Sequence, residues 1–348
     1  MLPLIRNVVL TSARRDRTEI NEALVDAMEE MFHPRALAIH RCYLNDSAVI
    51  IFDCAGQGPD GRYVRNAYLP DRRYCRSINE DALLARCGKE MTTVLEEQSD
   101  GTHRLVFPVL QEEHLLYLID VILPAEFPAE ERVVLMGLTE YFSNHIGLLD
   151  YGETDTLTRL SNRKTFDKHL FEVLGKAARD EPQDTRAVPH RRQGGGDDAA
   201  HWLAVCDIDK FKNINDTYGH LMGDEVLVVL AQIMRSSFRF DDQLFRFGGE
   251  EFIAVVQPTN REGAIVVFER FRKAVESHDF SRVGRVTISS GFTRLRPNDL
   301  PSDAIGRADE ALYYAKQNGR NQACLYEDLV AEGKLRAKQA DNNDLELF

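Results

Sequence analysis

The chain has 348 residues, which is enough for two domains that each bury a hydrophobic core. Its formal net charge of −13 disfavours non-specific binding to nucleic acid, so we expect no nucleic-acid partner. No apolar run approaches the roughly 20 residues of a membrane-spanning helix, the N-terminus has no secretory-signal layout, and the six cysteines include no Cys-x-x-Cys pair. These features favour a cytoplasmic protein without a membrane partner, a disulfide framework or a zinc site.

Residues 1–128 predict a small α/β module. In chain order we expect a helix over 13–32, strands over 36–43 and 48–54, a glycine-rich loop over 56–61, a helix over 79–87, and strands over 104–110 and 115–123. The order of these elements is typical of a sensory domain that takes a small ligand or another signal. No ligand motif is visible in it.

A connecting helix is predicted over 129–153. Its apolar residues step by three and four, as in a short coiled coil: Leu135, Leu138, Phe142, His145 and Leu149. The same spacing also fits the last helix of the preceding module. We expect one helix that packs on its own domain and also pairs with a second copy of the chain.

Residues 154–328 predict an α+β domain with a mainly antiparallel sheet. A disordered insertion, rich in Asp, Arg, Pro and Gly, is expected over about 178–200. After it we expect a strand over 201–208, helices over 210–218 and 223–239, a hairpin over 242–257, a helix over 260–277, a strand over 285–293, a helix over 302–317 and a strand over 321–326. Residues 329–348 are left as a C-terminal tail.

Two clusters of carboxylates stand out in this second domain. Gly248-Gly249-Glu250-Glu251 lies between two strand-like runs, and the glycines allow a tight turn that a polyanion can approach closely. Adjacent glutamates repel each other, unless a cation lies beside them. A second pair, Asp207 and Asp209, ends a short apolar strand. Together they predict a hard oxygen site suited to Mg²⁺ or Mn²⁺.

These motifs resemble those of the GGDEF family of diguanylate cyclases, in the GGEEF spelling. The resemblance also includes Asp155–Arg163 at the domain entrance and Tyr314–Asn321 near its end, and it covers about half of the chain. Arg159 stands where the family usually has glycine. In the first domain, Leu105–Val109 and Leu118–Val121 look like the GAF family, with PAS as the alternative.

The resemblance implies condensation of two GTP molecules into cyclic di-GMP, with release of pyrophosphate. The sheet would then resemble the ferredoxin-like palm of nucleotidyl cyclases, with Asp207 and the hairpin tip meeting at one edge of it. Asp207 and Glu250 are expected to bind Mg²⁺ through their side chains and Ile208 through its carbonyl, while Glu251 supports the tip. Asp209 is either a further ligand or a cap of the following helix.

The resemblance also assigns nucleotide contacts. Asn215 and Asp224 match the guanine readers, since an aspartate accepts from a donor pair that adenine lacks. The other expected substrate contacts are Phe211, Lys212, Gly248, Gly249, Lys316 and Arg320, with the three cations on the β- and γ-phosphates. An inhibitory site for the product is expected at Arg239, Asp242 and Arg270. A surface salt bridge is the alternative interpretation of Arg239 and Asp242.

The product is two-fold symmetric, so a homodimer of two facing half-sites is expected. Two other functions are weighed against cyclization of GTP. A degenerate domain that only binds GTP or cyclic di-GMP is disfavoured because Asp207 and Glu250 are retained. A variant that makes cyclic GMP-AMP is disfavoured because Asp224 is retained.

Overall fold

A computed structural model describes residues 14–45, 48–58, 61–111, 113–179 and 199–336. The chain divides into two compact units, 1–154 and 155–348, and each is described by itself. Most of the insertion expected over 178–200, and the end of the tail from 337, lie outside the described residues. Of the helices within those ranges, none is both long enough and apolar enough to cross a membrane.

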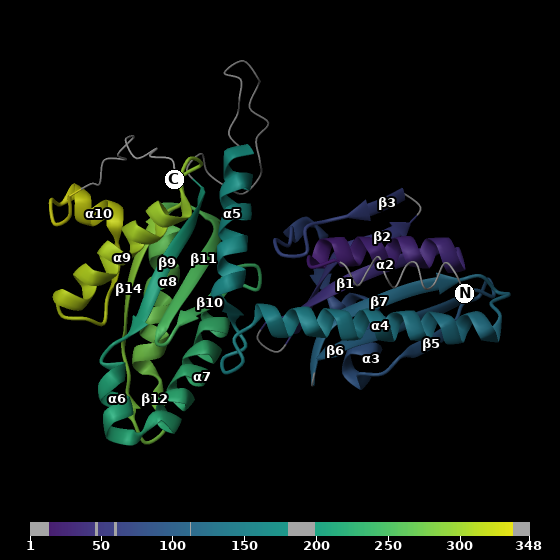
Figure 1. The fold of residues 1–348 in the computed structure, drawn as a ribbon, viewed down its shortest axis with the longest axis horizontal. Coiled ribbons are helices and arrows are strands. Elements are labelled where there is room, and N and C mark those ends of the chain that lie inside the picture. Colours follow the sequence, from purple (N-terminus) through teal and green to yellow (C-terminus); the bar gives the residue numbers. More distant parts are fainter. Residues whose placement is uncertain (1–13, 46–47, 59–60, 112, 180–198, 337–348) are drawn as a thin grey trace, which may run out of the picture. The chain divides into compact units, whose positions relative to one another are not determined.

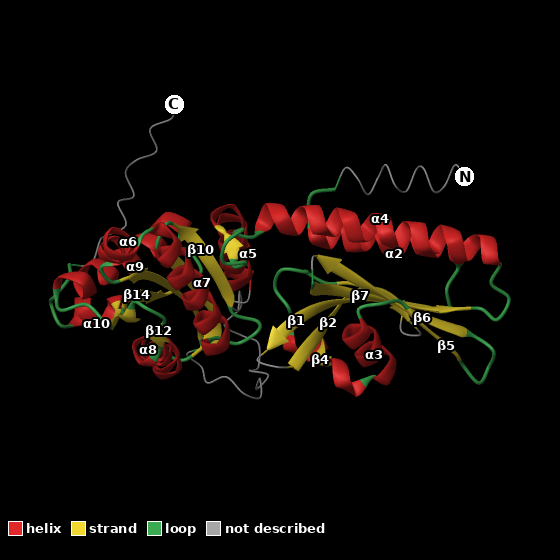
Figure 2. Cartoon of the chain, turned by 90° about the horizontal axis from the view of Figure 1, so that it is seen from below, coloured by secondary structure: helices red, strands yellow, loops and turns green. Residues whose placement is uncertain are grey.

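The N-terminal unit is a seven-stranded antiparallel sheet with helices on both faces. Its strands are β1 (Ala36–Asn45), β2 (Ala48–Gly58), β3 (Gly61–Val64), β4 (Cys75–Ser77), β5 (Val94–Glu97), β6 (His103–Gln111) and β7 (His114–Leu123). They lie in the order β3-β2-β1-β7-β6-β5, with β4 pairing with β2. Helices α2 (Arg17–Phe32) and α4 (Ala129–Glu153) cover one face, and α3 (Ala82–Glu90) covers the other (Figure 2).

Most of the expected elements of this unit are confirmed. The loop expected over 56–61 is wrong for residues 56–58 and 61, which belong to strands, and residues 59–60 lie outside the described residues. Strand β2 continues through Gly58, and Gly56 pairs with Tyr63 of β3. A Cβ at position 56 would lie 2.3 Å from the Leu37 carbonyl oxygen, so glycine is needed for close packing. Sequence reasoning took a strand glycine for a turn glycine.

The apolar stripe of α4 is buried in its own domain. Leu135 and Phe142 are 0% exposed and Leu138 is 3% exposed, all within the core between α4, α2 and the sheet. The Phe142 ring meets Tyr117 edge-on, with the ring centroids 6.2 Å apart. This stripe therefore cannot also pair two chains, which corrects the expectation from its spacing. The exposed apolar residues of α4 are Val133, Met136, Leu148 and Tyr151.

The last turn of α4 is tied to the start of α2. Arg17 is 2% exposed, and its guanidinium donates to Glu153 Oε2 at 2.5 Å and to Asp150 Oδ1 at 2.7 Å. The Tyr68 hydroxyl donates to the other Glu153 oxygen at 2.8 Å. Because a buried guanidinium needs such partners, this contact fixes the end of the helix against its own domain.

The C-terminal unit has a six-stranded sheet in the order β15-β14-β9-β11-β10-β8 (Figure 1). The strands are β8 (Ser161–Asn162), β9 (Ala200–Ile208), β10 (Gln243–Gly248), β11 (Glu251–Thr259), β14 (Ile288–Arg294) and β15 (Ala323–Leu325); β12 (Asp279–Phe280) and β13 (Gly284–Arg285) form a separate small hairpin. Only the outermost pairs, β14 with β15 and β8 with β10, are parallel. The expected α+β fold with a mainly antiparallel sheet is confirmed.

Six helices belong to this unit in the described residues: α5 (Arg163–Arg179), α6 (Phe211–Tyr218), α7 (His220–Ser237), α8 (Arg261–Ser277), α9 (Pro301–Gln317) and α10 (Tyr326–Ala331). Sequence reasoning missed α5, which follows the two-residue strand β8. It also placed part of α10 in the tail, although Leu329 of this helix is buried.

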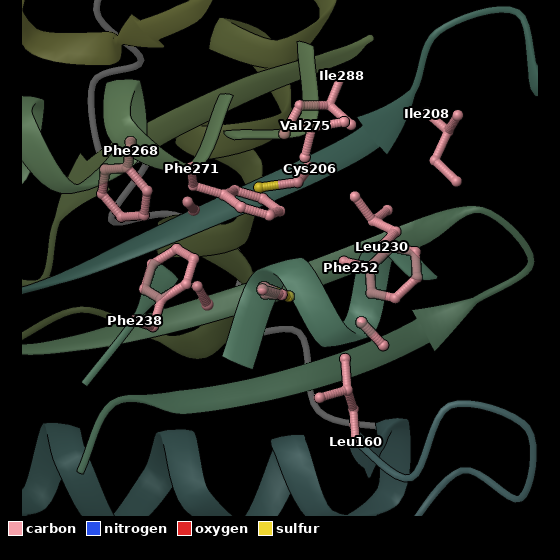
Figure 3. Close-up of a cluster of buried hydrophobic side chains, with 14 of the residues drawn as sticks. Leu160, Cys206, Ile208, Leu230, Phe238, Phe252, Phe268, Phe271, Val275 and Ile288 are labelled. Carbon is pink, nitrogen blue, oxygen red and sulfur yellow. The ribbon is translucent and has the colours of Figure 1, made fainter. Parts of the chain in front are cut away.

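The central strand β9 is buried because it has a neighbour on each side and helices above it. Figure 3 shows its Cys206 and Ile208 among side chains from other elements, including Phe252, Phe268 and Phe271. This packing carries the strand straight to Asp207, so the core positions a carboxylate near the end of the strand.

Two glycines of this unit test the packing of α9 on the sheet. A Cβ on Gly291 of β14 would lie 2.1 Å from backbone atoms of Ala308 and Leu312, whereas a Cβ on Gly306 of α9 meets nothing within 4 Å. We expect Gly291→Ala to lower the free energy of unfolding by about 2 kcal/mol or more. Gly306→Ala should raise it by about 1 kcal/mol, because alanine favours a helix interior.

Chemical denaturation of both variants measures the difference. Equal effects of the two substitutions would contradict this account of the β14–α9 contact.

Candidate active site

Asp207 lies near the end of β9 with a polar residue directly opposite it on each side. Its partner on β11 is Glu251 and its partner on β14 is Ser289. The hairpin tip and Asp207 therefore meet as expected. They meet where the central strand β9 ends, at the edge of the sheet that the strand ends form.

The tip is held from below by Arg246. The β10–β11 pairing is irregular between Arg246 and Gly248, and Gly249 has a φ of 51°, which glycine adopts without strain. The Arg246 guanidinium donates to the Gly249 carbonyl at 2.9 Å and to Asp155 Oδ1 at 3.1 Å. The tip and the domain entrance are thus joined through one arginine.

Asp155 also organises the turn at the domain entrance. It accepts from the backbone N–H of Thr158 at 2.8 Å and from its hydroxyl at 2.7 Å. Arg159 follows with a φ of 59°, a left-handed conformation that favours glycine. This backbone explains why glycine is usual at the position where this chain has arginine.

Negative charge is concentrated around Asp207. Burial and the nearby Glu251 and Asp209 raise the pKa of Asp207, although Lys316 Nζ lies 2.8 Å from Asp207 Oδ2 and opposes the shift. Burial, Asp207 and Glu251 likewise raise the pKa of Glu250. Raised pKa values show that the folded protein disfavours these charges, which a bound cation would compensate.

Two further carboxylates accompany this cluster, and sequence reasoning missed one of them. Asp309 on α9 has its pKa raised by desolvation and by Glu251, and Lys316 opposes this. Asp209 is buried and accepts from the Thr287 and Ser289 hydroxyls, each at 2.7 Å. Asp209 is therefore neither a helix cap nor an open ligand, since its oxygens already bind β14 and the residue before it.

The residues present fit a divalent cation only in part. In the described portion of the chain, no three His, Cys, Asp or Glu side chains converge to hold a metal by themselves. Asp207, Glu250 and the Ile208 carbonyl supply hard oxygen donors, and the Lys316 ammonium stands beside Asp207 where a cation fits. A Mg²⁺ ion would need further oxygens, which a polyphosphate or water supplies.

Asn215 and Asp224 come from two helices that pack against each other, α6 and α7. A Cβ on Gly223 would lie 2.0 Å from Asn215 Oδ1, so the missing side chain lets Asn215 approach α7 next to the exposed Asp224. Phe211 is different: its side chain is buried in the domain core, so only its backbone is left for the expected substrate contact.

The remaining predicted cations are spread out. Arg320 lines a cleft of about 420 Å³ beside α6, together with Lys210 and Arg285. Lys316 lies at Asp207, while Lys212 is exposed on α6 and does not line this cleft. The structure thus brings Lys316 to the carboxylates and Arg320 to a neighbouring cleft.

The three predicted inhibitory residues lie close together. Asp242 is buried, and its carboxylate accepts from the backbone N–H groups of Arg239 and Gln257, both at 2.9 Å. Arg239 is exposed, and the exposed Arg270 donates to the carbonyl of Ser237, two residues before it. Asp242 thus shapes the turn, and two arginines project from its neighbourhood.

The N-terminal unit has a buried polar cluster that sequence reasoning also missed. His40 Nδ1 lies 2.7 Å from Asp53, and Asp120 forms an ion pair with Arg104 at 2.7 Å. Burial disfavours the charged imidazole, but hydrogen bonds to Asp120 and Asp53 raise the pKa of His40 nonetheless. Alternation along a strand cannot reveal such pairing across strands.

Comparison with known proteins gives consistent matches for the second half of the chain. The profile of the family described as "Diguanylate cyclase, GGDEF domain" matches residues 153–322. Diguanylate cyclase DgcZ of Escherichia coli (strain K12) is 41% identical over 177 residues, which cover 50% of this chain and 53% of that protein. A diguanylate cyclase of Vibrio cholerae serotype O1 is 27% identical over 324 residues, or 87% of this chain and 94% of the other.

Among solved structures, the GGDEF domain of DgcB from Caulobacter crescentus, in complex with c-di-GMP, is 32% identical with a TM-score of 0.44; the match covers 51% of this chain and 94% of that one. The chain spans between 23% and 53% of the length of curated relatives that are 38% to 41% identical to it. Residues 153–322 of this chain therefore form a GGDEF domain.

Proposed function

We propose that this protein is a diguanylate cyclase, which joins two GTP molecules into cyclic di-GMP and releases two pyrophosphates. The observation that carries the proposal is the convergence of Asp207 with the Glu250–Glu251 tip around Lys316. Relatives that share this half of the chain are named diguanylate cyclases. The reaction is attack of a ribose 3′-hydroxyl on an α-phosphorus, and it needs charge stabilisation more than covalent chemistry.

Each residue of the site has a role in this proposal. Asp207, Glu250 and the Ile208 carbonyl hold Mg²⁺ (or Mn²⁺), and Glu251 supports the tip. The ion neutralises charge that develops on the triphosphate. Lys316 is already at the carboxylates and moves to phosphate oxygens when a nucleotide enters, with Lys212 and Arg320 as the other phosphate contacts. Gly248 and Gly249 let the tip lie over the nucleotide.

Guanine is selected between α6 and α7. Asp224 accepts from the N1–H and the 2-amino group, and Asn215 completes the reading. Adenine offers no such donor pair, so the Asp224 carboxylate would have no partner on an adenine base. The retained Asp224 favours GTP over a mixed guanine–adenine product.

The first prediction concerns the carboxylates. Asp207→Asn or Glu250→Gln should reduce cyclic di-GMP formation at least about a thousandfold, because each removes a charge from the proposed cation site. The raised pKa values mean that the ionised carboxylates disfavour folding above their usual pKa. Neither variant should therefore have a lower Tm at pH 7, and Mg²⁺ with GTP should raise the Tm of the unsubstituted protein but not that of these two variants.

Asp279→Asn, which changes an exposed carboxylate outside the cluster, is the matched control and should behave like the unsubstituted protein. Normal turnover by either Asp207→Asn or Glu250→Gln would refute the assignment of the site.

We further propose that cyclic di-GMP inhibits the enzyme at Arg239, Asp242 and Arg270. Guanidinium groups bind guanine edges and phosphates through paired hydrogen bonds, and both arginines here are exposed. The Asp242 carboxylate keeps the turn in shape through two backbone N–H groups.

Arg239→Ala should therefore raise the concentration of cyclic di-GMP that halves activity by about tenfold or more, without changing the initial rate. Arg296→Ala, another exposed arginine, is the control. Calorimetry with cyclic di-GMP checks the site independently: if the unsubstituted protein binds none, the inhibitory site does not exist.

We also propose that the active form is a homodimer. One domain supplies one guanine pocket and one carboxylate cluster, which suffice for a single GTP, whereas the product has two identical bonds. The buried stripe of α4 is excluded from the interface, so the exposed residues Val133, Met136, Leu148 and Tyr151 are the surface that pairs two helices.

Leu148→Glu should lower activity per chain while leaving GTP affinity per domain unchanged, because it charges an exposed side chain of α4. Leu138→Glu should instead unfold the N-terminal unit, since Leu138 is buried. Ultracentrifugation and activity are measured over a dilution series. Constant specific activity down to concentrations with only monomer would show that no dimer is needed.

Control by the N-terminal unit is part of the same proposal. We propose a GAF-like sensory domain, with PAS as the alternative, that responds to a small ligand or signal. Arg17 and Tyr68 donate hydrogen bonds to Glu153, one residue before the unit ends. A ligand that alters these hydrogen bonds would change how two α4 helices meet, and hence how often the half-sites align.

A further inference from the structure

The loop that follows α9 has an unusual backbone. Gly319, Arg320 and Asn321 have φ values of 110°, 61° and 47°, so three consecutive residues occupy the left-handed half of conformational space. Glycine adopts such angles freely and asparagine tolerates them, but arginine does so at a cost. A conformation of this kind persists only where surrounding contacts hold it.

Asn321 makes those contacts through its backbone N–H and both polar atoms of its side chain. Its backbone N–H donates to Asp209 Oδ2 at 3.0 Å. Its side-chain oxygen accepts from Arg272 at 2.7 Å, and its side-chain nitrogen donates to Glu276 at 2.9 Å. We call Asp209, Arg272, Glu276 and Asn321 the loop clasp.

The partners of Asn321 are themselves fixed. Asp209 is 8% exposed and bonded to β14 through Ser289, and it lies two residues after Asp207. Arg272 is also 8% exposed and is paired with Glu269 and Glu276 of its own helix, at 2.7 and 2.6 Å. The clasp therefore joins the end of the central strand, helix α8 and the loop.

The side chain that this loop presents is Arg320. It is exposed, lines the cleft of about 420 Å³ with Lys210, and precedes the clasped residue directly. No other residue of the loop carries charge. Arg320 is thus the one charged side chain of this loop, and the strained backbone sets the direction of its guanidinium.

We propose that Asn321, together with Asp209, is a positioning residue, which holds Arg320 in place for the polyphosphate of the nucleotide. This inference rests on the proposed function for the identity of the nucleotide. Asp209 then has two structural roles, because it fixes both the strand that carries Asp207 and the loop that carries Arg320.

Asn321→Gly tests this without forcing a new backbone, since glycine accepts the left-handed angles and keeps the N–H to Asp209. We expect KM for GTP, and the GTP dissociation constant by calorimetry, to rise roughly tenfold with kcat within about twofold, because a misplaced arginine weakens binding of ground and transition state alike. Asn260→Gly, which removes the exposed N-cap hydrogen bond from Gly263 N–H at the start of α8, is the control for general loosening and should leave both constants unchanged.

The decisive variant is the double substitution. In an Arg320→Ala background, Asn321→Gly should add little, because its effect passes through Arg320. A full additional tenfold loss in that background, or an unchanged KM and dissociation constant in Asn321→Gly alone, would overturn the proposal, as would a lower Tm as its only effect.

Failure of the Asn321 proposal can be distinguished from failure of the proposed function. If the unsubstituted chain binds GTP but forms no cyclic di-GMP, the cyclase assignment fails while calorimetry still decides the role of the clasp. If it binds no GTP at all, both proposals fail.

Discussion

The structure of the C-terminal unit depends on crowding several carboxylates at the end of one buried strand. Asp207 is directly opposite Glu251, and the hairpin keeps Glu250 beside them. Burial raises the pKa values of Asp207 and Glu250, and repulsion between the neighbouring carboxylates raises them further. Lys316 offsets part of this repulsion. Keeping such a cluster costs stability, and the proposed binding of a cation and a polyphosphate would offset that cost.

The surrounding structure keeps the cluster from relaxing. Strand β9 has a neighbour on either side, so Asp207 cannot move without disturbing the whole sheet. The tip is clamped through Arg246 to Asp155, and the loop after α9 is clamped to Asp209. The tip and the loop after α9 are therefore each held in place by hydrogen bonds to other parts of the unit. Pre-organised charge of this kind costs no rearrangement when a reaction begins.

Sequence reasoning found the parts whose chemistry is local. The Gly248–Gly249 turn between two apolar runs and the aspartates after a buried strand follow from spacing and residue type alone, as does the order of the main helices and strands. Predictions from the sequence were wrong where the structure depends on contacts between residues that are distant in the sequence. The spacing of Leu138 and Phe142 is the same whether a second chain or the parent domain covers them, and only the fold decides. Gly56 lies within a strand at a position that Tyr63 and Leu37 approach closely, and the local sequence does not show this approach.

The same limit applies within the site. Asp209 and Asp207 look alike in sequence, but Asp209 accepts from the hydroxyls of Thr287 and Ser289, whereas Asp207 lies opposite Glu251 of the tip. Asp309 joins the cluster from a helix about a hundred residues further along, so nothing near it in sequence marks it. Phe211 sits between charged residues and still belongs to the core.

The central claim is that this carboxylate cluster serves the joining of two GTP molecules. Incubating the full chain with GTP and MgCl₂ and identifying the products by mass spectrometry tests it most directly. The account predicts cyclic di-GMP and pyrophosphate in a ratio of one to two, with none formed when EDTA replaces the free metal. Unchanged GTP, hydrolysis to GMP or GDP, or product formation that continues in EDTA would contradict it.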